Sequence, residues 1–173
     1  NMMKRKFYGK KALELIEKIR KKIPDITIRT SLIVGFPGEG ENEFRDLKQF
    51  CKIAQFDRLG VFSYSREEGT EAFSLGDPVP SRIKEKRKKE IMELQAAISY
   101  KKNKAMIGRR VEVLVEGKLK ENQEFLIGRL KSQAPEVDGV VFVENNKNYN
   151  FNSIINIEIC DAYTYDLKGR IIN

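Results

Sequence analysis

The pattern of apolar residues changes at Gly108, and this change constrains the fold more than any other feature of the sequence. Before Gly108, apolar residues recur at helical spacing and alternate with short apolar runs, an order typical of an α/β fold with a parallel sheet. After Gly108, apolar and polar residues alternate with period two, in runs separated by Gly, Asn, Asp and Pro. The sequence therefore predicts an α/β part over residues 1–106 and a small antiparallel β-barrel or sandwich over residues 107–173.

The α/β part is expected to contain three helices and two strands. Short apolar runs predict the strands, and apolar residues three and four positions apart predict the helices. In chain order, we expect a helix over 10–23, a strand over 26–34, a helix over 44–54, a strand over 57–65, a polar loop over 66–80 and a long basic helix over 81–106. The alternating runs of the β part lie at 111–115, 125–127, 141–143 and 155–159.

Composition excludes several kinds of site. The chain contains no His, so imidazole cannot act as a zinc ligand, as a general base or in a Ser-His-Asp triad. Its two cysteines, Cys51 and Cys160, are too far apart in sequence to indicate a disulfide framework or a metal knuckle. No apolar run approaches the roughly 20 residues of a membrane span. We therefore expect a globular protein of the cytoplasm that does not contact a membrane.

The net charge of +8 is distributed unevenly. Residues 1–106 contain 24 Lys and Arg against 15 Asp and Glu, whereas residues 107–173 contain 9 against 10. Much of the excess lies in the predicted last helix, for example from Lys84 to Lys89, where a charge run is typical of a solvated helix face and less often of a phosphate-binding strip. The net charge of −1 in the β part favours a basic partner over the phosphates of a nucleic acid.

The stretch RTSLIVGFPGE, residues 29–39, is the sharpest local motif. A predicted strand ends here in a Gly-Pro-Gly turn that leads into a helix, and ligands of α/β sheets bind at the carboxyl ends of strands. Gly35 would let a planar ring approach the backbone, Ile33 would give that ring an apolar face, and Arg29 could pair with a carboxylate. An ordinary strand–turn–helix connection explains the same residues. A phosphate loop is disfavoured because no Gly-Lys-Ser/Thr follows the glycines.

A second predicted strand ends in the polar cluster SYSREEGT, residues 63–70. Tyr64, Ser65, Arg66 and Glu68 are candidates for binding a substrate, although a plain surface loop has a similar composition. Adjacent carboxylates on an extended chain point apart, so Glu67 and Glu68 do not form an acid–base pair.

The loop Gln133–Gly139 of the β part is acidic. Its Pro and Asp-Gly favour a turn, and its charge allows an acidic contact surface for a basic partner.

Three strings in the same order resemble the C-terminal part of the methylthiotransferase branch of the radical S-adenosylmethionine enzymes. They are RTSLIVGFPGE at 29–39, FDRLGVFSYSREEGT at 56–70 and MELQAAIS at 92–99. The β part resembles a TRAM domain, an OB-like barrel, and includes APEVDG at 134–139. Within the branch, GVFSYSREEGT and APEVDG resemble the enzymes that modify ribosomal protein S-twelve. The tRNA-modifying, MiaB-like relatives usually have a Pro-Arg-Pro-Gly-Thr-like run where this chain has residues 66–70.

The resemblance implies an enzyme that adds a methylthio group to the β-carbon of an aspartate in ribosomal protein S-twelve. It implies the last strands of a partial (β/α) radical SAM barrel, with S-adenosylmethionine and four-iron four-sulfur clusters as cofactors of the parent protein. The Cys-x3-Cys-x2-Cys signature of the family is absent from this sequence. We therefore expect a fragment that is inactive by itself and contains neither catalytic residues nor metal ligands.

The resemblance also implies which residues of this sequence bind the cofactor. Ile33 and Gly35 correspond to the strand that meets the adenine, and Arg29 is the candidate partner of the methionyl carboxylate. The other residues of the expected cofactor site are Pro37, Gly38 and Glu39 in the turn and Val61 and Phe62 on the next strand. Tyr64, Ser65 and Glu68 are expected on the substrate side.

Two alternative functions stay open at this point. A tRNA adenosine methylthiotransferase would need a basic face on the barrel, for which the candidates are Arg109, Arg110, Lys118, Lys120, Arg129 and Lys131. A non-catalytic OB-like binding module would need stacking aromatic residues on one barrel face.

Overall fold

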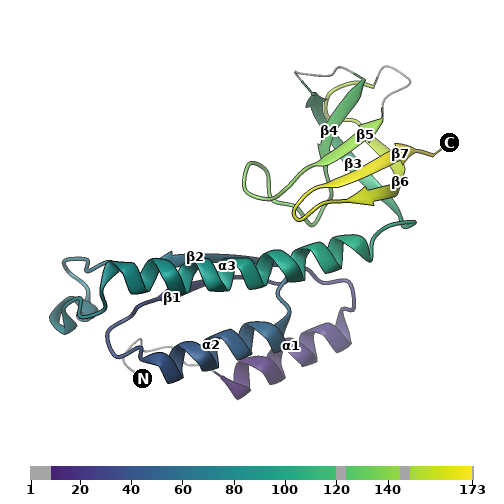
Figure 1. Ribbon diagram of the computed structural model, residues 1–173. Coiled ribbons are helices and arrows are strands. Elements are labelled where there is room, and N and C mark those ends of the chain that lie inside the picture. The colour runs from purple at the N-terminus through teal and green to yellow at the C-terminus, as the bar shows by residue number, and fades with distance from the viewer. Residues whose placement is uncertain (1–8, 120–123, 145–148, 173) are drawn as a thin grey trace. The chain divides into compact units, whose positions relative to one another are not determined.

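The computed structural model describes residues 9–119, 124–144 and 149–172. Its contacts divide the chain into two compact units, residues 1–95 and residues 96–173 (Figure 1). The division falls inside the longest helix, α3 (Ser81–Lys104). Lys120 and residues 145–148 lie outside the described residues.

The first unit alternates helices and strands as the sequence predicts. Its elements are α1 (Lys10–Lys22), β1 (Arg29–Val34), α2 (Glu41–Ala54), β2 (Arg58–Ser63), the 3-10 helix η1 (Glu71–Leu75) and the first part of α3. Strands β1 and β2 are parallel and in register, from Arg29 opposite Arg58 to Val34 opposite Ser63. A parallel α/β arrangement is therefore confirmed for this unit, and the carboxyl ends of the two strands lie side by side.

The two faces of the β1–β2 sheet differ in their environment. Side chains alternate along a strand, so Leu32 and Val34 lie on one face of β1 and Ile33 on the other. The first face packs into an apolar core with α2 and α3, which contains Val34, Phe44, Cys51, Val61 and Ile91, together with Leu32, Leu47, Phe50, Leu59, Met92 and Leu94. The opposite face is left exposed among the described residues, and the candidate site is built on it.

The second unit contains a closed five-stranded barrel. Its strands are β3 (Arg110–Lys118), β4 (Phe125–Arg129), β5 (Val141–Glu144), β6 (Ile154–Ala162) and β7 (Leu167–Ile171). They pair in the order β3-β4-β5-β7-β6, and β6 closes the barrel on β3. All pairs are antiparallel except β5 with β7. The barrel core contains Val113, Val115, Leu126, Leu130, Val141, Val143, Ile155, Ile157, Ile159, Ala162 and Leu167.

The fifth strand, β7, is not among the runs that the sequence predicted. Its inward positions are Leu167 and Gly169, and a glycine interrupts the period-two apolar pattern. A Cβ atom at position 169 would overlap Cδ1 of Ile157 on the neighbouring strand and lie 3.1 Å from the main-chain oxygen of Glu158, so glycine fits there without a shift. A close approach between two strands has thus removed the signal by which a strand is recognised.

Gly128 of β4 gives a test of barrel packing. A Cβ atom at this position would overlap Val113 and the carbonyl group of Leu114, which belongs to the backbone and cannot rotate away. We expect Gly128→Ala to lower the free energy of unfolding of the barrel by about 2 kcal/mol. Gly117→Ala on β3 is the matched control, because nothing lies within 4 Å of that added atom. Urea titration of both variants checks this, and equal midpoints would contradict the packing.

Candidate functional site

The carboxyl ends of β1 and β2 carry an exposed apolar surface. Ile33 and Phe62 are register partners, and their side chains are 40% and 58% exposed. Gly60 on β2 lies opposite Ser31, and the absent side chain leaves room beside the Phe62 ring. Ile33 and Phe62, two of the residues that the family resemblance assigns to the cofactor, thus lie side by side. An apolar, ring-sized surface at a strand end is the kind of face that an adenine can cover.

The turn after β1 is held by hydrogen bonds within it. The Gly35 amide donates to Oε1 of Glu39 at 2.8 Å, and the Glu39 amide donates to the carbonyl group of Phe36 at 2.8 Å. Gly35 has a φ of 74°, in the left-handed region that favours glycine. Pro37 is buried and Gly38 is exposed. The Glu39 carboxylate therefore stabilises the turn by accepting a hydrogen bond from the amide at its start.

Arg87 of α3 is the main partner of this turn. Its Nη1 donates to Oε1 and to the main-chain carbonyl group of Glu39, both at 2.9 Å, and its Nη2 donates to Oε1 of Glu41 at 2.8 Å. Burial acts to lower the pKa of the guanidinium group, but the hydrogen bonds and charges of Glu41 and Glu39 outweigh it and leave this pKa above its ordinary value. Arg87 thus stays charged and ties the turn to α3.

Lys84 of α3 holds the end of β2. Its Nζ donates to the carbonyl group of Tyr64 at 2.8 Å and to Oδ2 of Asp77 at 2.6 Å. Tyr64 itself is buried, with its hydroxyl group donating to the carbonyl group of Ala72 at 3.1 Å and its ring edge-on to Phe36 at 5.2 Å. The Tyr64 amide also donates to the carbonyl group of Val34, which joins the two strand ends.

The remaining predicted site residues are spread over different surroundings. The Val61 side chain lies in the apolar core, on the face of the sheet opposite to Ile33 and Phe62. Ser65 and Glu68 are exposed on the loop after β2. Arg29 is exposed at the amino end of β1, roughly 17 Å along the strand from Val34. The structure therefore separates Arg29 from the turn, pairs Ile33 with Phe62, and joins Gly35 to Glu39.

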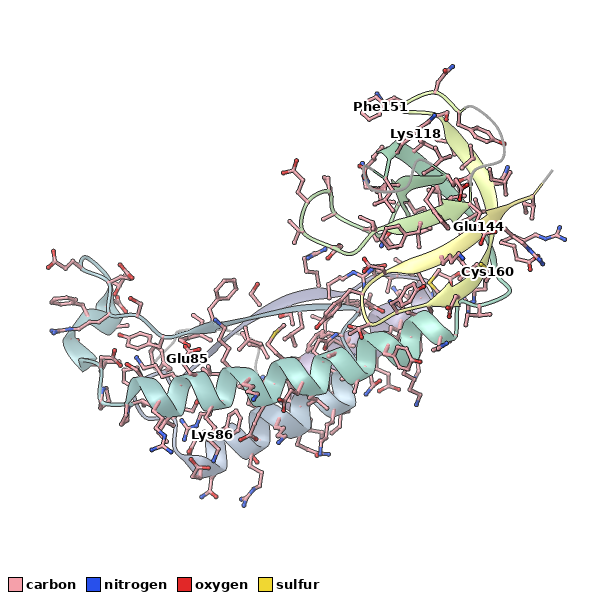
Figure 2. The ribbon with its side chains drawn as sticks, turned by 45° about the horizontal axis from the view of Figure 1, so that its top comes forward. Glu85, Lys86, Lys118, Glu144, Phe151 and Cys160 are labelled. Carbon is pink, nitrogen blue, oxygen red and sulfur yellow. The ribbon has the colours of Figure 1, made fainter. Side chains whose placement is uncertain are left out.

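Lys84 and Arg87 were not predicted as site residues, because a charge run such as 84–89 is typical of a solvated helix face. The structure corrects this interpretation: both residues are 4% exposed. A signal was present in their spacing. Positions 84, 87, 91 and 98 recur at helical intervals, so the two cations continue the apolar stripe that contains Ile91 and Ile98. Figure 2 labels their exposed neighbours Glu85 and Lys86, and Oε1 of Glu85 accepts a hydrogen bond from the Ser63 hydroxyl group at 2.8 Å.

The described residues contain no group of three or more His, Cys, Asp or Glu side chains that could hold a metal ion. Cys51 lies in the apolar core, where burial raises the pKa of its thiol to about 11. Cys160 is exposed on β6 (Figure 2). These two cysteines do not fit an iron–sulfur cluster. The helices of the described part also include none that is long and apolar enough to cross a membrane.

The acidic loop of the barrel is an ordered turn. The buried Gln133 side chain accepts a hydrogen bond from the Leu130 amide at 2.7 Å and donates to the carbonyl group of Gly139 at 2.5 Å. Oδ2 of Asp138 accepts from the Ala134 amide at 2.7 Å. Among the candidate basic residues of the barrel, Arg129 is paired with Glu116 at 2.7 Å, and Arg109, Arg110, Lys118 and Lys131 are exposed.

Comparison with known proteins first defines the class. Residues 107–172 match the TRAM domain family, so the β-barrel is a TRAM domain. The chain is 46% identical over 168 residues to the ribosomal protein uS12 methylthiotransferase RimO of Aquifex aeolicus (strain VF5). The aligned region covers 97% of this chain and 39% of that relative. It is 49% identical over 160 residues to the protein of the same name from Geobacter sulfurreducens, with 92% of this chain and 36% of the relative covered.

The class is therefore that of proteins related to methylthiotransferases and bearing a TRAM domain. More particularly, the chain corresponds in sequence to the C-terminal part of RimO. It spans less than two fifths of the length of these relatives.

Proposed function

We propose that this chain is part of an enzyme that adds a methylthio group to the β-carbon of an aspartate in ribosomal protein uS12. The observation that carries this proposal is the similarity to RimO, at 46–49% identity over 92–97% of the chain. The iron–sulfur clusters belong to the parent protein, with ligands outside this sequence, and the parent protein acts in the cytoplasm.

The apolar surface at the strand ends is our proposed binding face for S-adenosylmethionine. Ile33 and Phe62 supply the contact for the adenine, because they are adjacent and exposed. When bound, S-adenosylmethionine supplies the group that abstracts hydrogen and the methyl group of the product. Ser65 and Glu68, which are exposed beyond β2, and Tyr64, which is buried, remain candidates for the substrate side. Arg29 remains a candidate partner of the methionyl carboxylate.

The charge of the TRAM domain supports a protein substrate. Residues 107–173 carry a net charge of −1, whereas a surface that grips RNA is expected to be basic. Ion pairing of Arg129 with Glu116 further reduces the positive charge available to phosphates. A basic ribosomal protein suits this surface better than tRNA does.

Mass spectrometry of ribosomal protein uS12 tests the proposed function. The protein is purified from source cells with and without the parent gene, and its intact mass is compared. We expect a gain of one methylthio group only in the presence of the gene, and peptide mapping should place it on an aspartate. An unmodified protein in both strains, with methylthio-adenosine in tRNA dependent on the gene, would instead support the tRNA alternative.

Phe62 gives a residue-level test of the binding face. We expect Phe62→Ala, made in the full-length enzyme, to weaken S-adenosylmethionine binding about tenfold, because the ring offers most of the exposed apolar area. Folding should be little affected since the side chain is 58% exposed. Ile53→Ala on α2 is the control, because Ile53 is 54% exposed and lies outside the site. Equilibrium dialysis measures both, and equal affinities would remove Phe62 from the site.

A further inference from the structure

Two buried cations of α3 lie at the carboxyl ends of β1 and β2. Lys84 and Arg87 are each 4% exposed, in contrast to Glu85 and Lys86 between them (Figure 2). Removing a charged group from water is unfavourable unless partners compensate it. Because the two residues are three positions apart, they share one face of the helix. Their burial therefore reflects specific partners on that face.

Each cation holds the end of a different strand. Lys84 donates to the carbonyl group of Tyr64, the first residue after β2, at 2.8 Å. Arg87 donates to the Glu39 carboxylate and main-chain carbonyl group, in the turn after β1, at 2.9 Å each. One helix face thus contacts the carboxyl ends of both strands.

The two sets of contacts converge on Gly35. Oε1 of Glu39, which accepts from Arg87, also accepts from the Gly35 amide at 2.8 Å. On the Cα side of Gly35, the Lys84 stem fills the space that a side chain would occupy. Gly35 directly follows β1 and lies two residues after Ile33, so both contacts act on the chain next to the apolar surface.

We propose that Arg87 and Lys84 are positioning residues that fix the end of β1 at the S-adenosylmethionine site. This inference rests on the proposed function. Neither residue touches the ligand in this assignment: Arg87 acts through Glu39, and Lys84 acts through Gly35 and the Tyr64 carbonyl group. Loss of either contact frees Gly35 and shifts Ile33 relative to Phe62, which weakens binding of the ligand.

The experiment uses the full-length enzyme with its clusters in place. We expect Arg87→Met to raise the dissociation constant of S-adenosylmethionine about tenfold with unchanged iron content. Lys84→Met, which keeps an unbranched apolar side chain and removes the charge, should also raise the dissociation constant. It provides the test if Arg87→Met fails to fold. Anaerobic equilibrium dialysis gives the dissociation constants.

Two controls separate positioning from general loss of stability. Lys48→Met removes the 2.8 Å pair between Lys48 and Glu90, which also links α2 to α3 but does not contact the strand ends. Ile91→Val destabilises the same core one turn further along α3. Both variants should leave the dissociation constant within about twofold of the value for the unaltered enzyme, because neither removes a contact at the strand ends.

A double variant tests the route of action. If Arg87 acts through Glu39, the double variant Arg87→Met, Glu39→Gln should have a dissociation constant for S-adenosylmethionine no higher than that of the single variant that binds less tightly. Additive effects, or unchanged affinity in both Arg87→Met and Lys84→Met, overturn the inference. The proposed function fails separately, if the unaltered enzyme binds S-adenosylmethionine but leaves uS12 unmodified. Absence of S-adenosylmethionine binding by the unaltered enzyme overturns both.

Discussion

Ile157→Ala is expected to lower the free energy of unfolding of the TRAM barrel by about 3 kcal/mol. Ile157 is fully buried on β6 and lies in the centre of the barrel core, where truncation leaves a cavity that the closed sheet cannot collapse around. A loss of this size is a large share of the stability of a small domain. Amide hydrogen exchange followed by NMR reports it, because barrel amides and α/β amides are resolved separately.

Ile154→Ala on the same strand is the control for this prediction. Ile154 is 66% exposed, so the substitution removes the same atoms from a position that faces solvent. We expect a change of less than about 0.5 kcal/mol. If both variants lose the same protection, the inward and outward faces of β6 are assigned wrongly.

Gly35→Ala is the second substitution with a large expected effect. Its backbone has a φ of 74°, which disfavours a side chain, and the added Cβ would overlap carbon atoms of the buried Lys84 stem. We expect a loss of about 3 kcal/mol from the α/β unit, since both effects act together. The same hydrogen-exchange experiment measures it, through the amides of β1 and β2.

Gly69→Ala isolates the backbone contribution. Gly69 has nearly the same φ, 76°, but nothing lies within 4 Å of an added Cβ. Its replacement should cost about 1 kcal/mol, the penalty of the left-handed conformation alone. Equal losses at Gly35 and Gly69 would show that the Lys84 stem does not fill the space beside Gly35.

The architecture was largely predictable because hydrophobic periodicity reports on burial. The switch from helical spacing to period two separated the α/β elements from the barrel strands, and the structure confirms both kinds of element. Strand β7 escaped prediction because Gly169 takes the place of an inward apolar residue. Periodicity detects the side chains that fill a core, and it fails where one strand must approach another too closely for a side chain.

The candidate site was predictable only in part. Ile33 was named from the strand-end motif and Phe62 from the family resemblance, and the parallel register places the two residues side by side. Lys84 and Arg87 were missed because residue type suggested solvent, whereas their position on the helix placed them on the buried face. Glu39, the partner of Arg87, is 48 residues away in sequence, and Asp77, the partner of Lys84, lies in the loop before α3, so helical spacing reveals neither pairing.

The strand order of the barrel has a consequence during protein synthesis. Strand β7 is made last of the five, yet it lies between β5 and β6 and pairs with both. Nascent chains must therefore wait for residues 167–171 to leave the ribosome before the barrel can close. A stop codon ahead of Leu167 would leave β5 and β6 with unpaired edges, and such edges are sites where one unfinished chain adds to another.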